Sequence, residues 1–277
     1  MHRGATGSIA IRHNQAPDPA DARLLTAAEF RQSDLVMRRR VMMAWAFSSP
    51  EDAGPALLPL IDAALQDADQ EVRWHAVATL QRAETKANVA RLAKRPVATD
   101  PRSYPALFKT LWNLLDDPDG TVRQGIVSAL TSFEVPPGET LTAEFLNRLA
   151  TERYPEVRVR MVTALAQSAR NGSGKALAAT LAALDDSDAR VQLSAVNAMR
   201  HLRRPEALPR LIQLMSVVRP PPIRRAVVQT LAAYGAAAQS ELPTIRAQLL
   251  SEMDPAIKAE LQRLVDRLDN PPSASRD

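Results

Sequence analysis

Histidine and cysteine are the residues that most often bind metals or act as nucleophiles and bases. The chain of 277 residues has four histidines and no cysteine, which excludes disulfides, thiolate metal sites and thiol nucleophiles. His2 and His13 lie near the N-terminus, while His75 and His201 lie three units apart in the repeat described below. That separation is too large for a shared metal or a proton relay. We therefore expect no catalytic residues, no metal site, no cofactor and no enzyme activity.

A glycine-rich stretch, "NGSGKA" from Asn171 to Ala176, has some of the residue types of a phosphate-binding loop. Backbone amides at a helix start can bind phosphate. However, the stretch lacks the earlier glycine of a Walker motif, and Ala176 follows Lys175 where Ser or Thr would ligate magnesium. The alternative is an ordinary turn in which Ser173 caps the next helix.

The charged residues are 35 Lys and Arg against 31 Asp and Glu, which gives a net charge of +4. Arginine accounts for all but five of the basic residues, and its planar fork suits carboxylates and phosphates. The N-terminus lacks the apolar stretch of a signal peptide, and the longest apolar run is too short to span a membrane. We expect a cytoplasmic protein that does not bind membranes.

One pattern recurs along the chain, as in "DADQEVRWHAVATL" and "ERYPEVRVRMVTAL". Its first apolar position falls at Met37, Val72, Val122, Val157, Val191, Ile223 and Ile257. Copies follow one another at about 34 residues, apart from one long interval of 50 residues after Val72. Within each copy the first, fifth, eighth and ninth positions are apolar or small, and the sixth is apolar in all but the last copy, which together form one broad face of a helix.

A second amphipathic helix precedes each of these helices, as in "PALLPLIDAALQD" and "EALPRLIQLM". Pro59, Pro209 and Pro243 lie in these preceding helices, where we expect them to bend the rod. Asp and Pro in "DDPDG" and "MDPA" supply the turn and the cap of the second helix. The prediction is a stack of antiparallel helix pairs with no strands.

These features resemble the HEAT repeat, especially the short bacterial form also found in phycobilisome lyases. The resemblance implies an all-α fold, a right-handed α-α superhelix of about seven helix pairs. It also implies that the arginine after the first apolar position pairs with an acid of the preceding turn. Arg123 and Arg158 each have an acid six residues earlier. Gln192 and Arg224 break that pattern, so we expect the series to be interrupted at both.

The predicted domain organisation has three parts. Residues 1–24 and 269–277 are expected to be disordered tails, and residues 25–268 form the repeat array. Residues 94–105, with three prolines, are expected to be an insertion loop within it.

The variable positions of the second helices are the candidate binding surface. Positions 3, 4, 7, 10 and 11 lie off the buried face and, by resemblance to HEAT solenoids, line the concave side. They hold eight arginines, Arg39, Arg40, Arg82, Arg160, Arg200, Arg225, Arg263 and Arg267, against only Glu260 and Asp266. Trp74, at an exposed position beside His75, is a further candidate contact. The predicted partner-binding residues are Arg39, Arg40, Trp74, His75, Arg82, Arg160, Arg200 and Arg225.

Such a basic face attracts acidic partners. The sequence therefore favours a non-catalytic interaction scaffold that binds an acidic or helical segment of another protein. Two alternatives remain. One is a HEAT-like protein that binds DNA, and the other is a cofactor-handling subunit like a bilin lyase.

Overall fold

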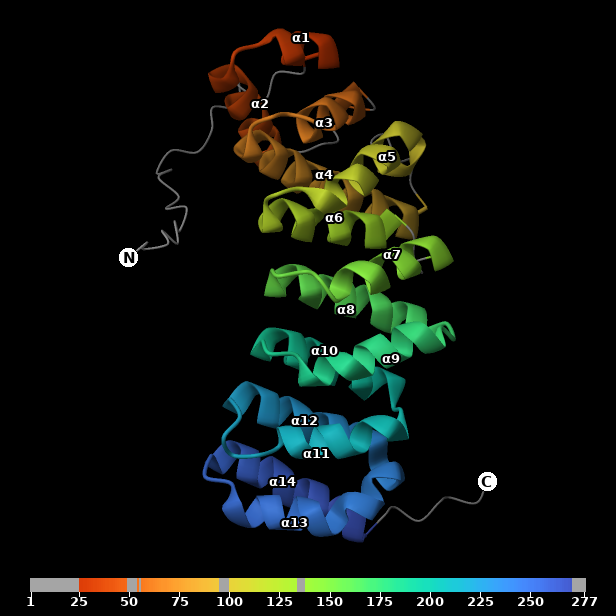
Figure 1. Cartoon of the computed structure of the whole chain (residues 1–277), viewed down its shortest axis with the longest axis vertical. Helices are drawn as coiled ribbons and strands as arrows, with labels where there is room; N and C mark the ends of the chain where they lie inside the picture. Colours follow the sequence, from red (N-terminus) through yellow and green to blue (C-terminus); the bar gives the residue numbers. More distant parts are fainter. Residues whose placement is uncertain (1–24, 49–53, 55, 95–99, 134–137, 271–277) are drawn as a thin grey trace. The chain divides into compact units, whose positions relative to one another are not determined.

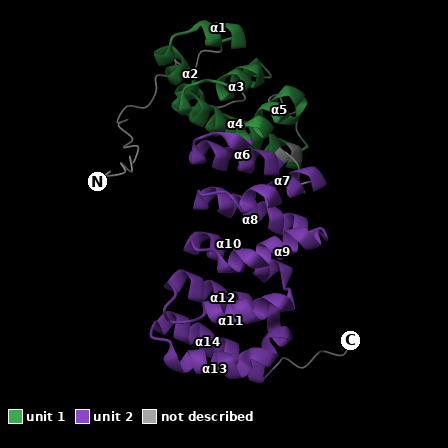
Figure 2. Ribbon diagram, in the orientation of Figure 1, with its two compact units in different colours: residues 1–114 green, residues 115–277 purple. Residues whose placement is uncertain are grey.

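The computed structural model describes residues 25–48, 54, 56–94, 100–133 and 138–270, and every regular element in these ranges is a helix (Figure 1). The predicted all-helical class is therefore confirmed. The two predicted tails lie almost wholly outside the described ranges, except that the last helix continues to Asp269. The chain divides into two compact units, residues 1–114 and 115–277 (Figure 2).

The described residues of the first unit include these helices and a short 3-10 turn. They are α1 (Ala27–Gln32), α2 (Leu35–Phe47), α3 (Leu57–Leu65), α4 (Gln70–Leu92), the 3-10 turn η3 (Pro101–Ser103) and α5 (Pro105–Asn113). Helix α4 packs against both α2 and α3, and α3 also packs against α5. This arrangement buries α3 almost completely, from Leu57 to Leu65.

The second unit alternates first and second helices through the remaining repeats. After the 3-10 turn η4 (Leu114–Asp116) come α6 (Gly120–Phe133), α7 (Glu139–Leu149), α8 (Pro155–Arg170), α9 (Gly174–Ala182), η5 (Ala183–Asp185) and α10 (Ala189–Leu202). They are followed by η6 (Pro205–Ala207), α11 (Leu208–Leu214), α12 (Pro221–Tyr234), η7 (Gly235–Glu241), α13 (Leu242–Ser251) and α14 (Pro255–Asp269). The second helices α6, α8, α10, α12 and α14 pack on one another in that order, and the first helices lie along one side of them (Figure 1).

The periodic apolar face forms the core, as predicted. In α8, Val157, Met161, Val162, Ala164 and Leu165 are all buried, and the equivalent face of α14 is buried as well. Burying each large aliphatic side chain contributes about 1.5–3 kcal/mol. Met37 is an exception, because its side chain is 44% exposed although it occupies the first apolar position of its repeat.

Proline begins the first helices rather than bending them, contrary to the expectation for Pro209 and Pro243. Each is the second residue of its helix, α11 and α13, and follows a 3-10 turn. A proline there loses nothing, since the first N–H groups of a helix have no partner within it. Pro59 is likewise near the start of α3, as its third residue.

The described end of the predicted insertion loop contains a 3-10 turn. Residues 95–99 lie outside the described ranges, but Asp100 accepts a hydrogen bond from the backbone N–H of Arg102 and starts the η3 turn, in which Pro101 is buried. Helix α5 then begins at Pro105.

Candidate functional site

The arginine at position 2 of the second helices links consecutive repeats. Arg123 of α6 donates from Nε and Nη2 to the two carboxylate oxygens of Glu152, at 2.9 and 2.7 Å. Its Nη1 donates to the backbone carbonyls of Asp117 and Pro118 in its own turn. One guanidinium therefore ties the start of its own helix to the turn of the next repeat, in the bidentate geometry that makes such pairs strong.

The same arrangement recurs at other repeats. Arg158 bonds both carboxylate oxygens of Asp186 at 2.9 and 2.8 Å, and Arg224 bonds those of Glu252 at the same two distances. In the first unit Arg38 binds Asp67 in this way. We call Arg38, Arg123, Arg158 and Arg224 the ladder arginines, and the acids that they bind the turn acids.

The sequence pattern paired each arginine with the acid of its own turn. That prediction was wrong, because the carboxylate that the arginine binds belongs to the turn of the next repeat. Arg158 does contact the acid six residues before it, but it bonds the backbone carbonyl of Glu152 at 3.1 Å. The carboxylate of Glu152 belongs to Arg123 of the preceding repeat and also accepts the backbone N–H of Tyr154. Each turn acid thus joins two repeats.

From the sequence we expected interruptions of the arginine–acid series at both Gln192 and Arg224. The structure places one missing arginine–acid pair, which we call the missing rung, at Gln192. Arg224 is a full ladder arginine, so the interruption predicted there is wrong. Position 2 of α10 holds Gln192, which is buried, and the turn-acid position of the following repeat holds Val218, which is 84% exposed. By equivalence with the other rungs these two residues would face each other, so both members of one pair are replaced together.

Two of the turn acids, Glu152 and Glu252, are held in their charged form. Hydrogen bonds from Arg224 lower the pKa of Glu252 below its ordinary value, although burial opposes this. Burial raises the pKa of Glu152, but hydrogen bonds from Arg123 and from the backbone outweigh it, so that its pKa is also lowered. The side chains of Arg224 and Glu252 are only 8% and 2% exposed. These pairs are structural, because little of either charge is accessible to a partner.

Five of the six predicted partner-binding arginines are accessible to solvent. Arg40, Arg82, Arg160 and Arg225 are exposed and Arg200 is half-buried, so all five can reach solvent. Arg160 and Arg200 make no ion pair with any residue that the structure describes. Arg225 lies 3.7 Å from Glu260, a loose ion pair.

Two predicted partner-binding residues differ from expectation: the charge of Arg39 is neutralised, and the side chain of His75 is buried. Arg39 is neutralised by Asp69 and Glu71 at 2.6 and 2.9 Å, acids that come from the start of α4 rather than from the variable positions. His75 is buried, with 5% of its surface exposed, because its ring packs edge-on against Trp74 at 4.8 Å. Trp74 itself is 39% exposed, as expected.

A cleft of about 310 Å³ lies between α12 and α14, at the variable positions. Gln229, Glu260, Arg263 and Arg267 line it together with apolar side chains from both helices. Arg263 bonds only a backbone carbonyl of its own helix among the described residues. Arg263 and Arg267 are therefore two further exposed arginines at the variable positions of the last helix.

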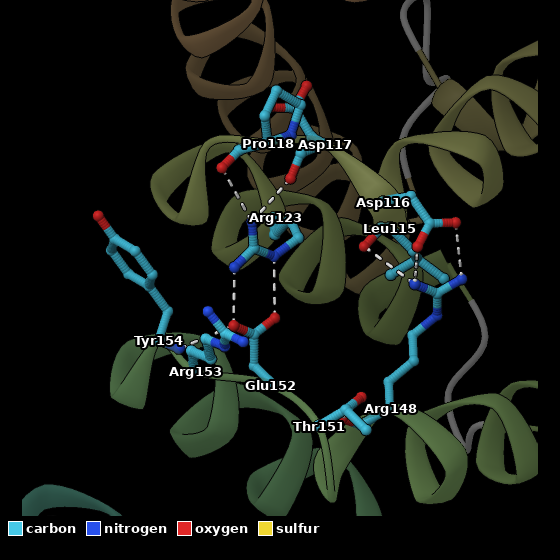
Figure 3. A pocket seen from close by; sticks show the side chains of 10 residues that line it. All are labelled: Leu115, Asp116, Asp117, Pro118, Arg123, Arg148, Thr151, Glu152, Arg153 and Tyr154. Atoms are coloured by element: carbon cyan, nitrogen blue, oxygen red, sulfur yellow. Dashed lines mark hydrogen bonds and ion pairs between the residues drawn. The ribbon is translucent and has the colours of Figure 1, made fainter.

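A larger cleft of about 460 Å³ lies at the turns before α6 and α8 and was not foreseen. Figure 3 shows the Arg123–Glu152 pair of its lining between the Arg148–Asp116 pair on one side and Tyr154 on the other. Arg148 also pairs with Glu144. The available sequence signal was Tyr154, which stands where most other repeats have an aspartate.

The remaining sequence motifs have structural explanations. Ser173 caps α9 by accepting the N–H of Ala176, so the capping interpretation of "NGSGKA" is confirmed. Over the described ranges, no group of three His, Asp or Glu side chains is placed to hold a metal ion. No helix in those ranges is long and apolar enough to cross a membrane.

Comparison with known proteins agrees with this repeat architecture. The family model described as HEAT repeats matches residues 142–232 and 177–264. A search of curated proteins finds no match. Among solved structures, YibA of Escherichia coli is similar with a TM-score of 0.62 and 15% identity, over 89% of this chain and 81% of YibA. Kap95 in the Kap95:Nup1 complex is similar with a TM-score of 0.54 and 15% identity, over 87% of this chain and 35% of Kap95. The family match identifies HEAT repeats over residues 142–264, and the stacked helix pairs agree with it.

Proposed function

We propose that the chain is a non-catalytic interaction scaffold that binds an acidic segment of another protein through Arg160 and Arg200, with Arg263 and Arg267 extending the same stripe. The observation that carries this proposal is how the arginines of the second unit are used. Arg123, Arg158 and Arg224 are each matched to a turn acid. Arg160 and Arg200 have no ion pair among the described residues, so their charge is available to a partner.

The neighbouring polar side chains suit a peptide partner. Thr163 and Ser194 lie within 3.2 Å of each other on adjacent second helices, and Gln229 donates to Glu260. These hydroxyl and amide groups lie on the same helices as Arg160, Arg200 and Arg225, and they can bond the backbone of a bound segment. The fold comparison supports the same class of function, since Kap95, which is similar in fold, forms a complex with Nup1.

The test is charge reversal at two exposed positions. We expect Arg160→Glu with Arg200→Glu to weaken binding of a fluorescein-labelled decaglutamate peptide by about tenfold or more, measured by fluorescence anisotropy. Wild-type binding should also weaken as salt rises. The melting temperature should change little, because exposed charges contribute about 0–1 kcal/mol to stability.

A matched control carries the same change of charge on the first helices. Lys109 of α5 and Lys175 of α9 are exposed, so Lys109→Glu with Lys175→Glu should leave peptide binding close to wild type. If both double variants lost peptide binding equally, the loss would reflect net charge alone, which would contradict the proposed site. Binding of duplex DNA but not of the peptide, abolished by the arginine variant, would favour a nucleic-acid-binding function instead.

A further inference from the structure

The cleft between α12 and α14 combines apolar side chains with exposed arginines. Its apolar lining is Val228 and Ala232 from α12 and Leu264 from α14, two helices that pack on each other. Val228 and Leu264 belong to the core and are each 2% exposed, whereas Ala232 is half-buried. Ala232 occupies position 10 of its helix, where α10 has Arg200. Its small side chain leaves space between the two helices.

The space is large enough for one aromatic ring. The cleft has a volume of about 310 Å³, and a cavity of about 150 Å³ already holds a benzene molecule. An apolar group that enters the cleft removes water from its apolar lining, which is favourable. The shape therefore suits a single side chain of a partner better than a flat surface would.

The charge of the lining suits an aromatic side chain with acids near it. Arg263 and Arg267 lie one turn apart on α14, are exposed, and make no ion pair with any residue that the structure describes. The one carboxylate of the lining, Glu260, is 24% exposed, lies 3.7 Å from Arg225 and accepts a hydrogen bond from Gln229. Guanidinium groups stack on aromatic rings and also bind carboxylates.

We infer that this cleft binds an aromatic side chain of the acidic segment that Arg160 and Arg200 bind. The inference rests on the proposed function, because it names one further residue of the same partner. Packed helices lie about 8–10 Å apart, so the cleft is roughly 12–15 Å beyond α10. An extended segment advances about 3.3 Å per residue, so about four residues span this distance. The partner therefore carries its aromatic residue about four positions from the acid that meets Arg200.

The experiment compares three fluorescein-labelled peptides on the full chain by fluorescence anisotropy. They are decaglutamate and two variants of it, in which a central glutamate is replaced by tryptophan or by serine. The tryptophan and serine peptides have equal charge, which is one less than that of decaglutamate. We expect the tryptophan peptide to bind about fivefold or more tightly than the serine peptide, because its ring is buried in the cleft. It should also bind more tightly than decaglutamate, although it has lost a charge.

Filling the cleft should remove this preference. Ala232→Phe places a ring in the cleft, so the tryptophan and serine peptides should bind it equally, while decaglutamate binding stays close to wild type. Ala233→Phe is the matched control, because Ala233 is half-buried on the same helix and does not line the cleft. It should keep the preference for tryptophan. Thermal melts check that both variants fold, and the comparison of the three peptides on the wild-type chain depends on neither variant.

The inference and the proposed function can fail separately. Decaglutamate binding that depends on Arg160 and Arg200, with no preference for tryptophan over serine, would overturn the inference and leave the proposed function standing. A preference that Ala232→Phe retains, or that Ala233→Phe removes equally well, would also overturn it. The same holds if a single-stranded oligothymidine displaces the tryptophan peptide from wild type but not from Ala232→Phe, since the cleft would then bind a nucleobase. Loss of decaglutamate binding alone, with the preference for tryptophan intact, would count against the proposed function only.

Discussion

Some arginines of the second helices pair with a turn acid, and others are exposed to solvent. Arg158 and Arg160 of α8 are an example of each. Arg158 has a side chain only 12% exposed and bonds Asp186 with both arms of its fork. Arg160 is exposed and makes no ion pair within the described residues. The two side chains leave the helix about 200° apart, because each residue advances the helix by about 100°. One therefore faces the next turn and the other faces solvent.

The stability of the fold should depend on Arg158 and not on Arg160. We expect Arg158→Ala to lower the free energy of unfolding by about 1.5–3 kcal/mol, since Asp186 loses a charged, bidentate partner. Arg160→Ala should change it by about 0.5 kcal/mol or less. Urea unfolding followed by circular dichroism measures both. Equal effects of the two substitutions would show that the ladder does not stabilise the stack.

At the residue scale the sequence predicted a structural role for Arg123 and Arg158 but not their partners, and it wrongly expected an interruption at Arg224. The acid six residues before Arg158 is close in sequence and does contribute its carbonyl, which made it the apparent partner. The true carboxylate comes from the next repeat, and stacking of the repeats decides that choice. The close approach of Tyr154 to Gly120 was missed for a similar reason, because the two residues lie in different repeats. His75 was placed on the exposed side by counting positions, whereas packing against Trp74 buries it.

At the scale of elements, the turn between first and second helices carries two functions within three residues. In the turn before α10, Asp186 accepts the fork of Arg158 and also the N–H of Asp188. Asp188 in turn caps α10 through the N–H of Arg190. One acid therefore joins the repeats and the next one starts the helix. This explains the "acid-x-Asp" spacing at Asp67, Asp186 and Glu252, whereas Glu152 is followed by Tyr154 and its helix has no side-chain cap.

The missing rung between α10 and α12 gives a direct test of this interpretation. Gln192→Arg alone should destabilise the protein, because it buries an unpaired charge. Val218→Asp alone should be close to neutral, since Val218 is exposed. The double substitution should recover stability, with a coupling free energy on the order of 0.5–3 kcal/mol in a double-mutant cycle. Strictly additive effects would mean that positions 192 and 218 do not face each other.

At the scale of the whole molecule, the repeat period predicted the fold because every copy buries the same face. Seven weak signals at a regular spacing are far more specific than any one of them. The division into two units at residues 114 and 115 was not predicted. It falls in the one long interval, between Val72 and Val122, where the pattern is interrupted. A periodic core depends on nearest-neighbour packing, so an irregular connection is where one compact unit can give way to another.

The acid dependence of stability is shared by several of the turns. Hydrogen bonds from Arg190 lower the pKa of Asp188 to about 2, and the pKa values of Glu152 and Glu252 are also lowered. In the unfolded chain such carboxyls titrate at about 4. The unfolded state therefore binds more protons in the acidic range, and the free energy of unfolding should fall as the pH drops from about 5 towards 2. Above pH 5 this contribution is complete and should stay constant.

Arg224→Ala should change this profile in a specific direction. The substitution leaves Glu252 buried without its guanidinium, so its pKa should rise and the charged form should become costly. The destabilisation relative to wild type should therefore be largest near pH 7 and should shrink as the pH falls and Glu252 becomes protonated. Arg160→Ala, whose side chain has no carboxylate partner within the described ranges, should follow the wild-type profile at every pH. Urea unfolding at a series of pH values measures all three proteins, and a penalty for Arg224→Ala that is independent of pH would show that Glu252 is not charged in the folded chain.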